Sequence, residues 1–145
     1  MNVLLIFPPS TIYGNDPTVP VIVPPLGLCY LAGYLEKHGY ENRVTVCDAR
    51  SLSQERIIRV GDRALYGLTD EELTEYIEKV SPDVVGISCM YTAYSGDAHN
   101  VARIIKKYNS DVPVVMGGAH ASTFPELVLR DKNTDVVVHF EGEET

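Results

Sequence analysis

The chain has 145 residues, 45% of them hydrophobic, which is enough for one domain with its own core. Its net charge of −8 and lack of any basic cluster argue against nucleic-acid and anionic-membrane partners. The three cysteines lie far apart, and neither a signal peptide nor an apolar run of about 18 residues occurs, so we expect a soluble, cytoplasmic protein with reduced thiols.

The first half of the chain predicts two strands separated by a helix. Residues 2–7 form an apolar run typical of a buried parallel strand. The loop over residues 8–25 is long and holds six of the nine prolines, which favours a functional role. Apolar residues at positions 28, 31, 32 and 35 predict a helix from residue 26 that Gly39 ends. A strand over 43–47 follows, whereas residues 49–68 are poorly patterned, with one helical turn expected at 55–60.

The second half predicts three more strands, at residues 83–88, 112–116 and 135–140. Helices are expected between them, with capping boxes at Thr69 and Glu72 and again at Thr123 and Glu126, and with an apolar face over 98–108. Alternating strands and helices indicate an α/β fold with helices on both faces of a parallel sheet. We predict a flavodoxin-like (Rossmann-like) five-stranded sheet in the order 2-1-3-4-5, with the six-stranded dinucleotide-binding order as the alternative.

The fifth strand, with valines at 136–138, is apolar on both faces and therefore needs a helix on each side. The final helix that normally follows such a strand is missing from the sequence. We therefore expect residues 1–145 to be one domain of a longer protein, with self-association through the uncovered strand as a further expectation.

Four loops are expected at the carboxyl edge of the sheet, where open α/β folds bind their ligands. Gly117 and Gly118 end the fourth strand, and glycine lets a flat ligand approach the backbone closely. A G-x-G-x-x-G motif, a P-loop and an acidic cluster are all absent, which argues against a typical dinucleotide, nucleotide or phosphoacceptor site. With these sites excluded, the edge is expected to bind a large, flat and largely uncharged ligand.

Two short motifs resemble a known family. Ser88-Cys89-Met90 is followed, after 26 residues, by Gly117-Gly118, which resembles the S-x-L and G-G elements of cobalamin-binding domains. Residues 24–36 (PPLGLCYLAGYLE), 117–122 (GGAHAS) and 135–143 (DVVVHFEGE) look like the amino-terminal half of B12-binding radical S-adenosylmethionine proteins. That family includes anaerobic magnesium-protoporphyrin IX monomethyl ester cyclases and methyltransferases. The resemblance implies cobalamin here, and a [4Fe-4S] cluster and S-adenosylmethionine in a downstream domain.

The resemblance also implies a cofactor site on the edge loops. The expected residues are Ser10, Thr11, Ser88, Met90, Tyr91, Thr92, Gly117, Gly118, Ala119, His120, Glu141 and Gly142. Classical cobalamin domains carry D-x-H-x-x-G after the first strand, but the corresponding loop here has no histidine. Cobalamin is therefore expected to bind without a lower axial histidine, for methyl transfer or oxidative cyclase-type chemistry in the parent protein. No residue of this chain is predicted to be catalytic or to bind a metal by itself.

Several residues have a second interpretation. His120 is expected to make a hydrogen bond that shapes its loop or contacts a corrin amide, or else a contact near the start of the next helix. Met90 and Tyr91 either support the macrocycle or pack their own loop. A cofactor-free binding or assembly module of the same fold is the alternative function, and a small nucleotide-binding enzyme is the third.

Overall fold

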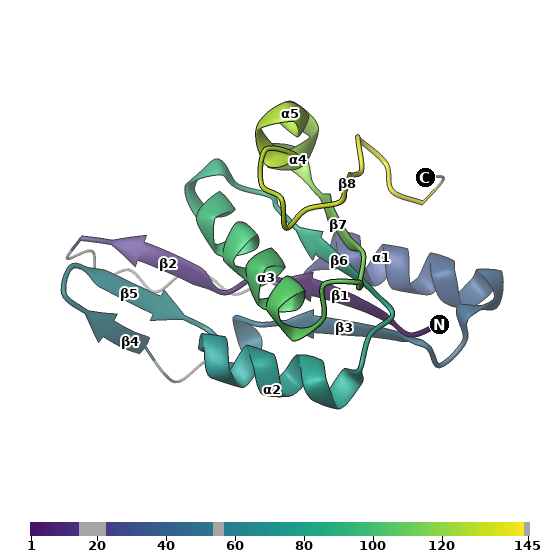
Figure 1. The fold of residues 1–145 in the computed structure, drawn as a ribbon, viewed down its shortest axis with the longest axis horizontal. Helices are drawn as coiled ribbons and strands as arrows, with labels where there is room; N and C mark the ends of the chain where they lie inside the picture. The colour runs from purple at the N-terminus through teal and green to yellow at the C-terminus, as the bar shows by residue number, and fades with distance from the viewer. Residues whose placement is uncertain (15–22, 54–56, 144–145) are drawn as a thin grey trace.

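The computed structural model describes residues 1–14, 23–53 and 57–143. Figure 1 shows a central sheet flanked by helices, with a smaller sheet at one end. The central sheet has five parallel strands in the order β3-β1-β6-β7-β8. These strands are β1 (Val3–Phe7), β3 (Val44–Asp48), β6 (Val84–Ser88), β7 (Val114–Gly117) and β8 (Val136–Val137). Counted among themselves they run 2-1-3-4-5, so the predicted topology is confirmed.

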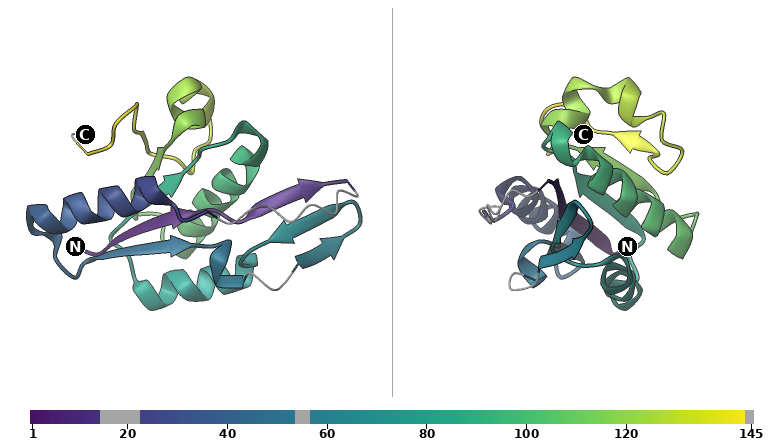
Figure 2. Two further views of the ribbon diagram at one scale, coloured as in Figure 1. Left: turned by 180° about the vertical axis from the view of Figure 1, so that it is seen from behind. Right: turned by 90° about the vertical axis from the view of Figure 1, so that its left-hand side faces the viewer.

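The helices cover the two faces of this sheet unequally (Figure 2). On one face lie α2 (Asp70–Val80), α3 (Ser95–Tyr108), α4 (Ala119–Thr123) and α5 (Pro125–Val128). On the other lies α1 (Leu26–Leu35), which continues into a wider helical turn, η1 (Glu36–Tyr40). Gly39 has φ of 99° in that turn and ends the helix as predicted.

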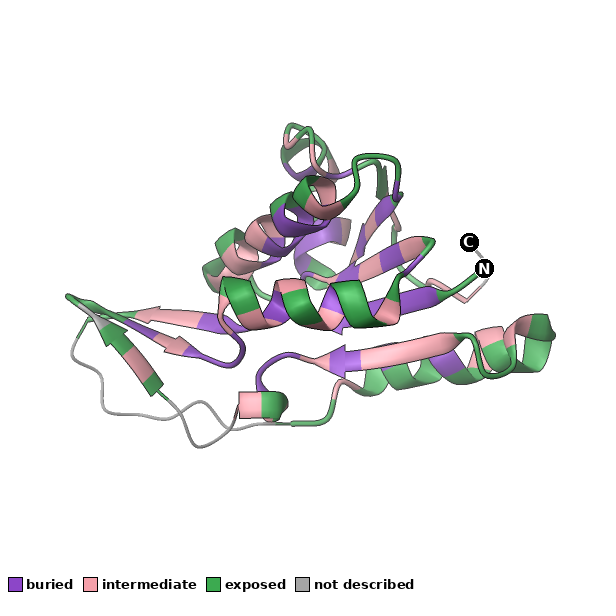
Figure 3. Ribbon diagram, turned by 60° about the horizontal axis from the view of Figure 1, so that its bottom comes forward, coloured by how far each residue is buried: buried purple, intermediate pink, exposed green. Residues whose placement is uncertain are grey.

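The larger core forms between the sheet and the α2–α3 side, where Leu4 and Ile6 of β1 are fully buried (Figure 3). Leu73 and Ile77 of α2 complete this layer from the helix side. Burying a side chain of this size stabilises the fold by about 1.5–3 kcal/mol. The smaller core joins α1 to the opposite face of β1 and β3. A strand buried on both faces is what the uninterrupted apolar run of β1 predicts.

One predicted capping box is confirmed and the other is wrong. The Thr69 hydroxyl accepts a hydrogen bond from the Glu72 amide at 3.2 Å, and the Thr69 amide donates to the Glu72 carboxylate at 2.9 Å. At the second site, the Thr123 hydroxyl donates to the carbonyl of Ala119 at 2.7 Å, inside α4. The hydroxyl bonds backward within its own helix, so α5 begins after Phe124 without a side-chain cap.

The small antiparallel sheet corrects the prediction for residues 49–68. It consists of β2 (Ser10–Tyr13), β5 (Arg63–Tyr66) and β4 (Ile57–Val60), in the order β2-β5-β4. Residues 55 and 56 of the expected helical turn lie outside the described residues, and 57–60 form a strand instead. Gly61, with φ of 61°, and Asp62 make the two-residue turn of a hairpin, which the short strands did not reveal.

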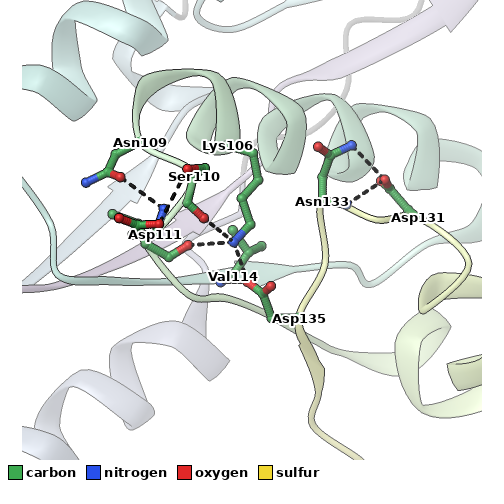
Figure 4. A network of polar contacts seen from close by, with 9 residues as sticks. Lys106, Asn109, Ser110, Asp111, Val114, Asp131, Asn133 and Asp135 are labelled. Atoms are coloured by element: carbon green, nitrogen blue, oxygen red, sulfur yellow. Dashed lines mark hydrogen bonds and ion pairs between the residues drawn. The ribbon is translucent and has the colours of Figure 1, made fainter.

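The start of β8 is fixed by a charged network (Figure 4). Asp135 accepts a hydrogen bond from the Val114 amide and pairs with the Lys106 ammonium, both at 2.7 Å. Lys106 also donates to the carbonyls of Ser110 and Val112 beyond the end of α3. The strand then ends at Val137, so the expected strand over 135–140 is too long. His139, expected to be a strand residue, is exposed beyond it.

Candidate functional site

The switch point of the sheet lies between β1 and β6, because the chain leaves β1 toward β3 on one side and later returns to β6 on the other. A shallow depression lies at the carboxyl end of these two strands. It is lined by Phe7, Pro8, Pro9, Ser10, Ser88, Cys89, Met90, Tyr91 and Tyr94. Its volume is about 240 Å³, open solvent included. Because that volume includes open solvent, the depression is a surface feature and not an enclosed pocket.

Gly118 is required by the packing of two loops. Its φ of 104° and ψ of 177° lie in a region that is essentially restricted to glycine. A Cβ at this position would lie 2.8 Å from the Cys89 carbonyl oxygen. That oxygen also accepts a hydrogen bond from the His120 amide at 3.1 Å. The loops after β6 and β7 therefore touch backbone to backbone at Gly118, and the chain itself occupies this position.

Gly117 differs from its neighbour. A Cβ built on it meets only Val138, at 3.7 Å, which is an ordinary contact, and its φ is not in the left-handed region. The packing of the described residues therefore gives no reason for glycine here. Gly117 lies opposite Ser88 in the sheet, and both are half-buried at the carboxyl edge. This part of the edge has room for an added group.

His120 and Thr92 join the same two loops through their side chains. Thr92 Oγ1 lies 3.0 Å from His120 Nδ1 in a hydrogen bond, and the His120 residue is only 4% exposed. Its ring packs against Phe124 at 5.3 Å between centroids. Burial lowers the pKa of His120, and the neighbouring charge of His99 lowers it further. The predicted loop-shaping hydrogen bond is thus present.

Apolar side chains line the rim on the β6 side. Met90 is 41% exposed and Tyr91 is 57% exposed, and Tyr91 meets Tyr94 edge to face at 6.1 Å between centroids. The preceding Cys89 is buried, which raises the pKa of its thiol to about 11. The thiol therefore stays protonated at neutral pH and is a poor nucleophile.

Ser10 and Thr11 lie in β2, whereas we expected them in an open loop. Ser10 is buried opposite Tyr66 of β5. The amide and hydroxyl of Thr11 donate to the Asp97 carboxylate at 2.8 and 2.6 Å. Burial raises the pKa of Asp97, and the two bonds from Thr11 oppose that rise. Asp97, in the first turn of α3, thereby holds β2 against the main domain; sequence reasoning missed this residue.

The loop after β8 is held away from the depression, against α1 and α4. A Cβ at Gly142 would lie 3.1 Å from Leu31 of α1. The Phe140 amide donates to the Ser122 hydroxyl at 3.0 Å. Glu141 is exposed beside Gly142, and Ala119 is exposed at the start of α4. The structure thus groups the loops after β1, β6 and β7 closely and places the β8 loop at the far side of the edge.

Arg50 is a buried cation at this edge that sequence reasoning did not single out. Its guanidinium lies 4.0 Å from the centre of the Phe7 ring and pairs with Asp48 at 3.6 Å. It also donates to the Val23 carbonyl at 3.3 Å. Arg50 closes the β3 flank of the edge. The only signal in the sequence is its position two residues after the strand-ending Asp48.

The fold and the edge define a doubly wound α/β domain with a depression at its switch point, which is where such folds bind their ligands. The B12 binding domain family matches residues 17–145, and the chain belongs to this family. No helix within the described ranges has the length and apolar character needed to cross a membrane.

The relatives of the chain include two methyltransferases and a cyclase. Cytidylyl-2-hydroxyethylphosphonate methyltransferase from Streptomyces wedmorensis is 35% identical over 99% of this chain and 27% of its own length. An uncharacterized methyltransferase from Pyrococcus horikoshii is 36% identical over 100% of the chain and 28% of its own length. Anaerobic magnesium-protoporphyrin IX monomethyl ester cyclase from Rubrivivax gelatinosus is 29% identical over 83% of the chain and 19% of its own length. The chain thus spans about a quarter of the length of the methyltransferases it matches.

Proposed function

We propose that the chain binds cobalamin across the carboxyl edge of β1, β6 and β7, as the amino-terminal domain of a cytoplasmic radical S-adenosylmethionine protein. The observation that carries this proposal is Gly117. It is a glycine that the described packing does not require, at the end of a central strand and beside the depression at the switch point. Membership of the B12-binding family supplies the identity of the ligand.

In this proposal, each residue at the edge makes a different contact with a broad, largely uncharged ligand. Gly117 leaves room against β7, and the half-buried Ser88 beside it offers a hydroxyl to an amide or to the nucleotide tail. Met90 and Tyr91 offer an apolar surface to the macrocycle. Bound cobalamin would supply a cobalt centre that carries or transfers a methyl group.

Two features support cobalt without a lower histidine from this chain. The loop after β1 contains no histidine between residues 8 and 25. His120, which lies at the edge, is only 4% exposed, and its ring packs against Phe124 inside the domain. We therefore assign His120 to loop structure.

The names of the relatives support a proposal for the activity of the whole protein. A protein about four times the length of this domain has room for a radical S-adenosylmethionine domain with a [4Fe-4S] cluster. The names of the relatives favour methyl transfer, or oxidative cyclization as the second chemistry. This domain would bind and orient the cofactor, and the downstream domain would act on the substrate.

The test is to mix the chain with hydroxocobalamin and separate the two by size exclusion. We expect the corrin absorbance to elute with the protein. The axial ligand is then read from the electron paramagnetic resonance of bound cob(II)alamin, with the protein labelled in turn with ¹⁴N and ¹⁵N. Identical spectra are expected, whereas a nitrogen splitting that changes with the label would show a protein ligand on cobalt. Failure of the corrin to co-elute would contradict the proposal.

A cofactor-free binding module is the second candidate, and one observation favours it. Two positions expected to face the ligand are engaged by the chain itself, since Gly118 packs on Cys89 and Thr11 bonds Asp97. The same co-elution experiment separates the candidates, because such a module would leave hydroxocobalamin free.

A further inference from the structure

Two buried cations of the domain differ in how completely they are bonded. The side chain of Lys106, at the amino edge of the sheet, is 15% exposed, and its ammonium makes three contacts of 2.7 to 3.1 Å (Figure 4). The side chain of Arg50, at the carboxyl edge, is 10% exposed, but it meets Asp48 at 3.6 Å and the Val23 carbonyl at 3.3 Å. Charge-assisted hydrogen bonds are about 2.7–2.9 Å long, so both contacts of Arg50 are long.

The flank around Arg50 contains two buried groups that can donate a hydrogen bond and have no partner. The Arg50 Nε and the Tyr66 hydroxyl form no hydrogen bond in the part of the chain that the structure describes. Tyr66 lies opposite Ser10 in the small sheet, and a Cβ on the next residue, Gly67, would lie 3.0 Å from the Arg50 Cα. A buried donor without an acceptor is costly, which indicates that a ligand supplies an acceptor here.

Arg50 lies directly beside the depression at the switch point. Its guanidinium is 4.0 Å from the centre of the Phe7 ring, and Phe7 is part of the lining of the depression. Ser10, the partner of Tyr66 in the small sheet, is part of the same lining. No charged side chain belongs to that lining. The edge thus combines an uncharged depression with one incompletely bonded cation on its flank.

The distance across the edge indicates the size of the ligand. Arg50 follows β3, and Gly117 ends β7, which is three strands away in the order β3-β1-β6-β7. Neighbouring strands lie about 4.8 Å apart, so the two positions are separated by roughly 14 Å. A ligand that meets both is therefore broad, and it carries an anionic group at one end.

We propose that the Arg50 guanidinium donates hydrogen bonds to the phosphodiester of bound cobalamin, the group through which the nucleotide tail is attached. This inference rests on the proposed function and adds a residue that selects for the tail. A phosphodiester is negatively charged, and the planar fork of a guanidinium matches two of its oxygens. The tail would then lie toward the β3 flank, and the macrocycle toward β6 and β7.

Two corrinoids test this contact, because they differ in the proposed acceptor. Hydroxocobalamin has the phosphodiester and the nucleotide base, whereas cobinamide has the same corrin ring and lacks both. Each is titrated into the wild-type chain, Arg50→Gln and Arg50→Lys, with circular dichroism to check folding. Arg130→Gln is the matched control, since Arg130 is exposed after α5 and its loss changes the net charge equally. Every variant is compared with the wild type on the same corrinoid.

We expect Arg50→Gln to weaken hydroxocobalamin binding about 10- to 100-fold, which is the effect of losing hydrogen bonds to a charged group. Cobinamide binding should change by less than about 3-fold, because its acceptor for Arg50 is absent. Arg50→Lys keeps the positive charge and should recover part of the loss with hydroxocobalamin. Arg130→Gln should bind both corrinoids as the wild type does.

Equal losses with both corrinoids would overturn the proposal, because Arg50 would then only support the fold of the edge. Unchanged hydroxocobalamin binding in Arg50→Gln would overturn it as well. If Arg50→Gln does not fold, the same comparison is made with Arg50→Lys, and a loss that is equal on the two corrinoids is again contradictory. The proposed function fails separately, if the wild-type chain binds neither corrinoid.

Discussion

Gly117 and Gly118 are neighbours in one G-G motif, yet the structure gives them different roles. Gly118 has a backbone conformation that excludes other residues, and its Cα faces the Cys89 carbonyl. Gly117 has an ordinary conformation and open space within 3.7 Å of where a side chain would begin. A motif of two glycines thus combines a structural requirement of the loops with a clearance at the ligand edge.

Of the substitutions that test this difference between the two glycines, Gly118→Ala should have the largest effect on stability. We expect Gly118→Ala to lower the free energy of unfolding by about 3 kcal/mol, because strain at a glycine-only φ,ψ costs about 1–3 kcal/mol and the contact with Cys89 adds to it. Urea denaturation measures the change. Gly33→Ala is the control, because Gly33 is exposed in α1 and a Cβ there meets no atom within 4 Å. This substitution should not lower the free energy of unfolding. An unchanged midpoint for Gly118→Ala would mean that the loops do not pack as described.

Thr92 tests the contact that holds Gly118 in place. Thr92→Val keeps the shape of the side chain but leaves the buried Nδ1 of His120 without its partner. We expect a loss of about 1–2 kcal/mol in unfolding free energy, since an unsatisfied buried polar group costs that much. Thr74→Val, in α2, removes a hydroxyl whose hydrogen bond goes to the Asp70 carbonyl within the same helix and should cost less. Equal losses would argue against a special role for Thr92.

His120 adds a pH dependence to the same contact. Its pKa is lowered in the folded state, so the unfolded chain, with an ordinary pKa of about 6.5, binds the proton more readily. The stabilising contribution is therefore complete above pH 6.5 and is lost as the pH falls through the folded-state pKa. We expect His120→Gln to flatten the decline in stability between pH 7 and pH 5, as followed by thermal melts. A decline of the same slope in both proteins would assign it to other groups.

Gly117→Ala should have the smallest effect on the fold. Its φ suits alanine, and the nearest atom is at contact distance, so stability should rise or stay within about 1 kcal/mol. The measurement is the same urea denaturation used for Gly118→Ala. A loss comparable to that of Gly118→Ala would show that both glycines are required by the fold and would remove the distinction between them.

The sequence predicted the parts of the molecule that depend on local pattern. Apolar runs located the five parallel strands, and Thr69 with Glu72 located the start of α2, because these signals lie within a few residues of each other. The antiparallel sheet was missed since β2 pairs with β5 about 50 residues away, and short strands have no distinct period. The capping box predicted at Thr123 was wrong because the Thr123 hydroxyl donates to the Ala119 carbonyl and does not accept from a backbone amide of the next helix.

The candidate site was predicted in outline, from the order of the loops, but not in its contacts. Thr11 and Asp97 lie 86 residues apart, and no local pattern links them. The distinction between Gly117 and Gly118 depends on what lies opposite each Cα, which only the folded chain determines. Membership of a family identifies the ligand, whereas the packing decides which residues are free to meet it.

The open position at Gly117 is tested most directly by titrating hydroxocobalamin into the wild-type chain, Gly117→Leu and the control Gly33→Leu. Circular dichroism checks that all three are folded, as we expect because a Cβ at Gly117 meets Val138 at an ordinary 3.7 Å and one at Gly33 meets nothing within 4 Å. We predict that Gly117→Leu weakens cobalamin binding at least 100-fold and that Gly33→Leu binds as the wild type does. Wild-type affinity in Gly117→Leu would contradict the placement of cobalamin against the end of β7.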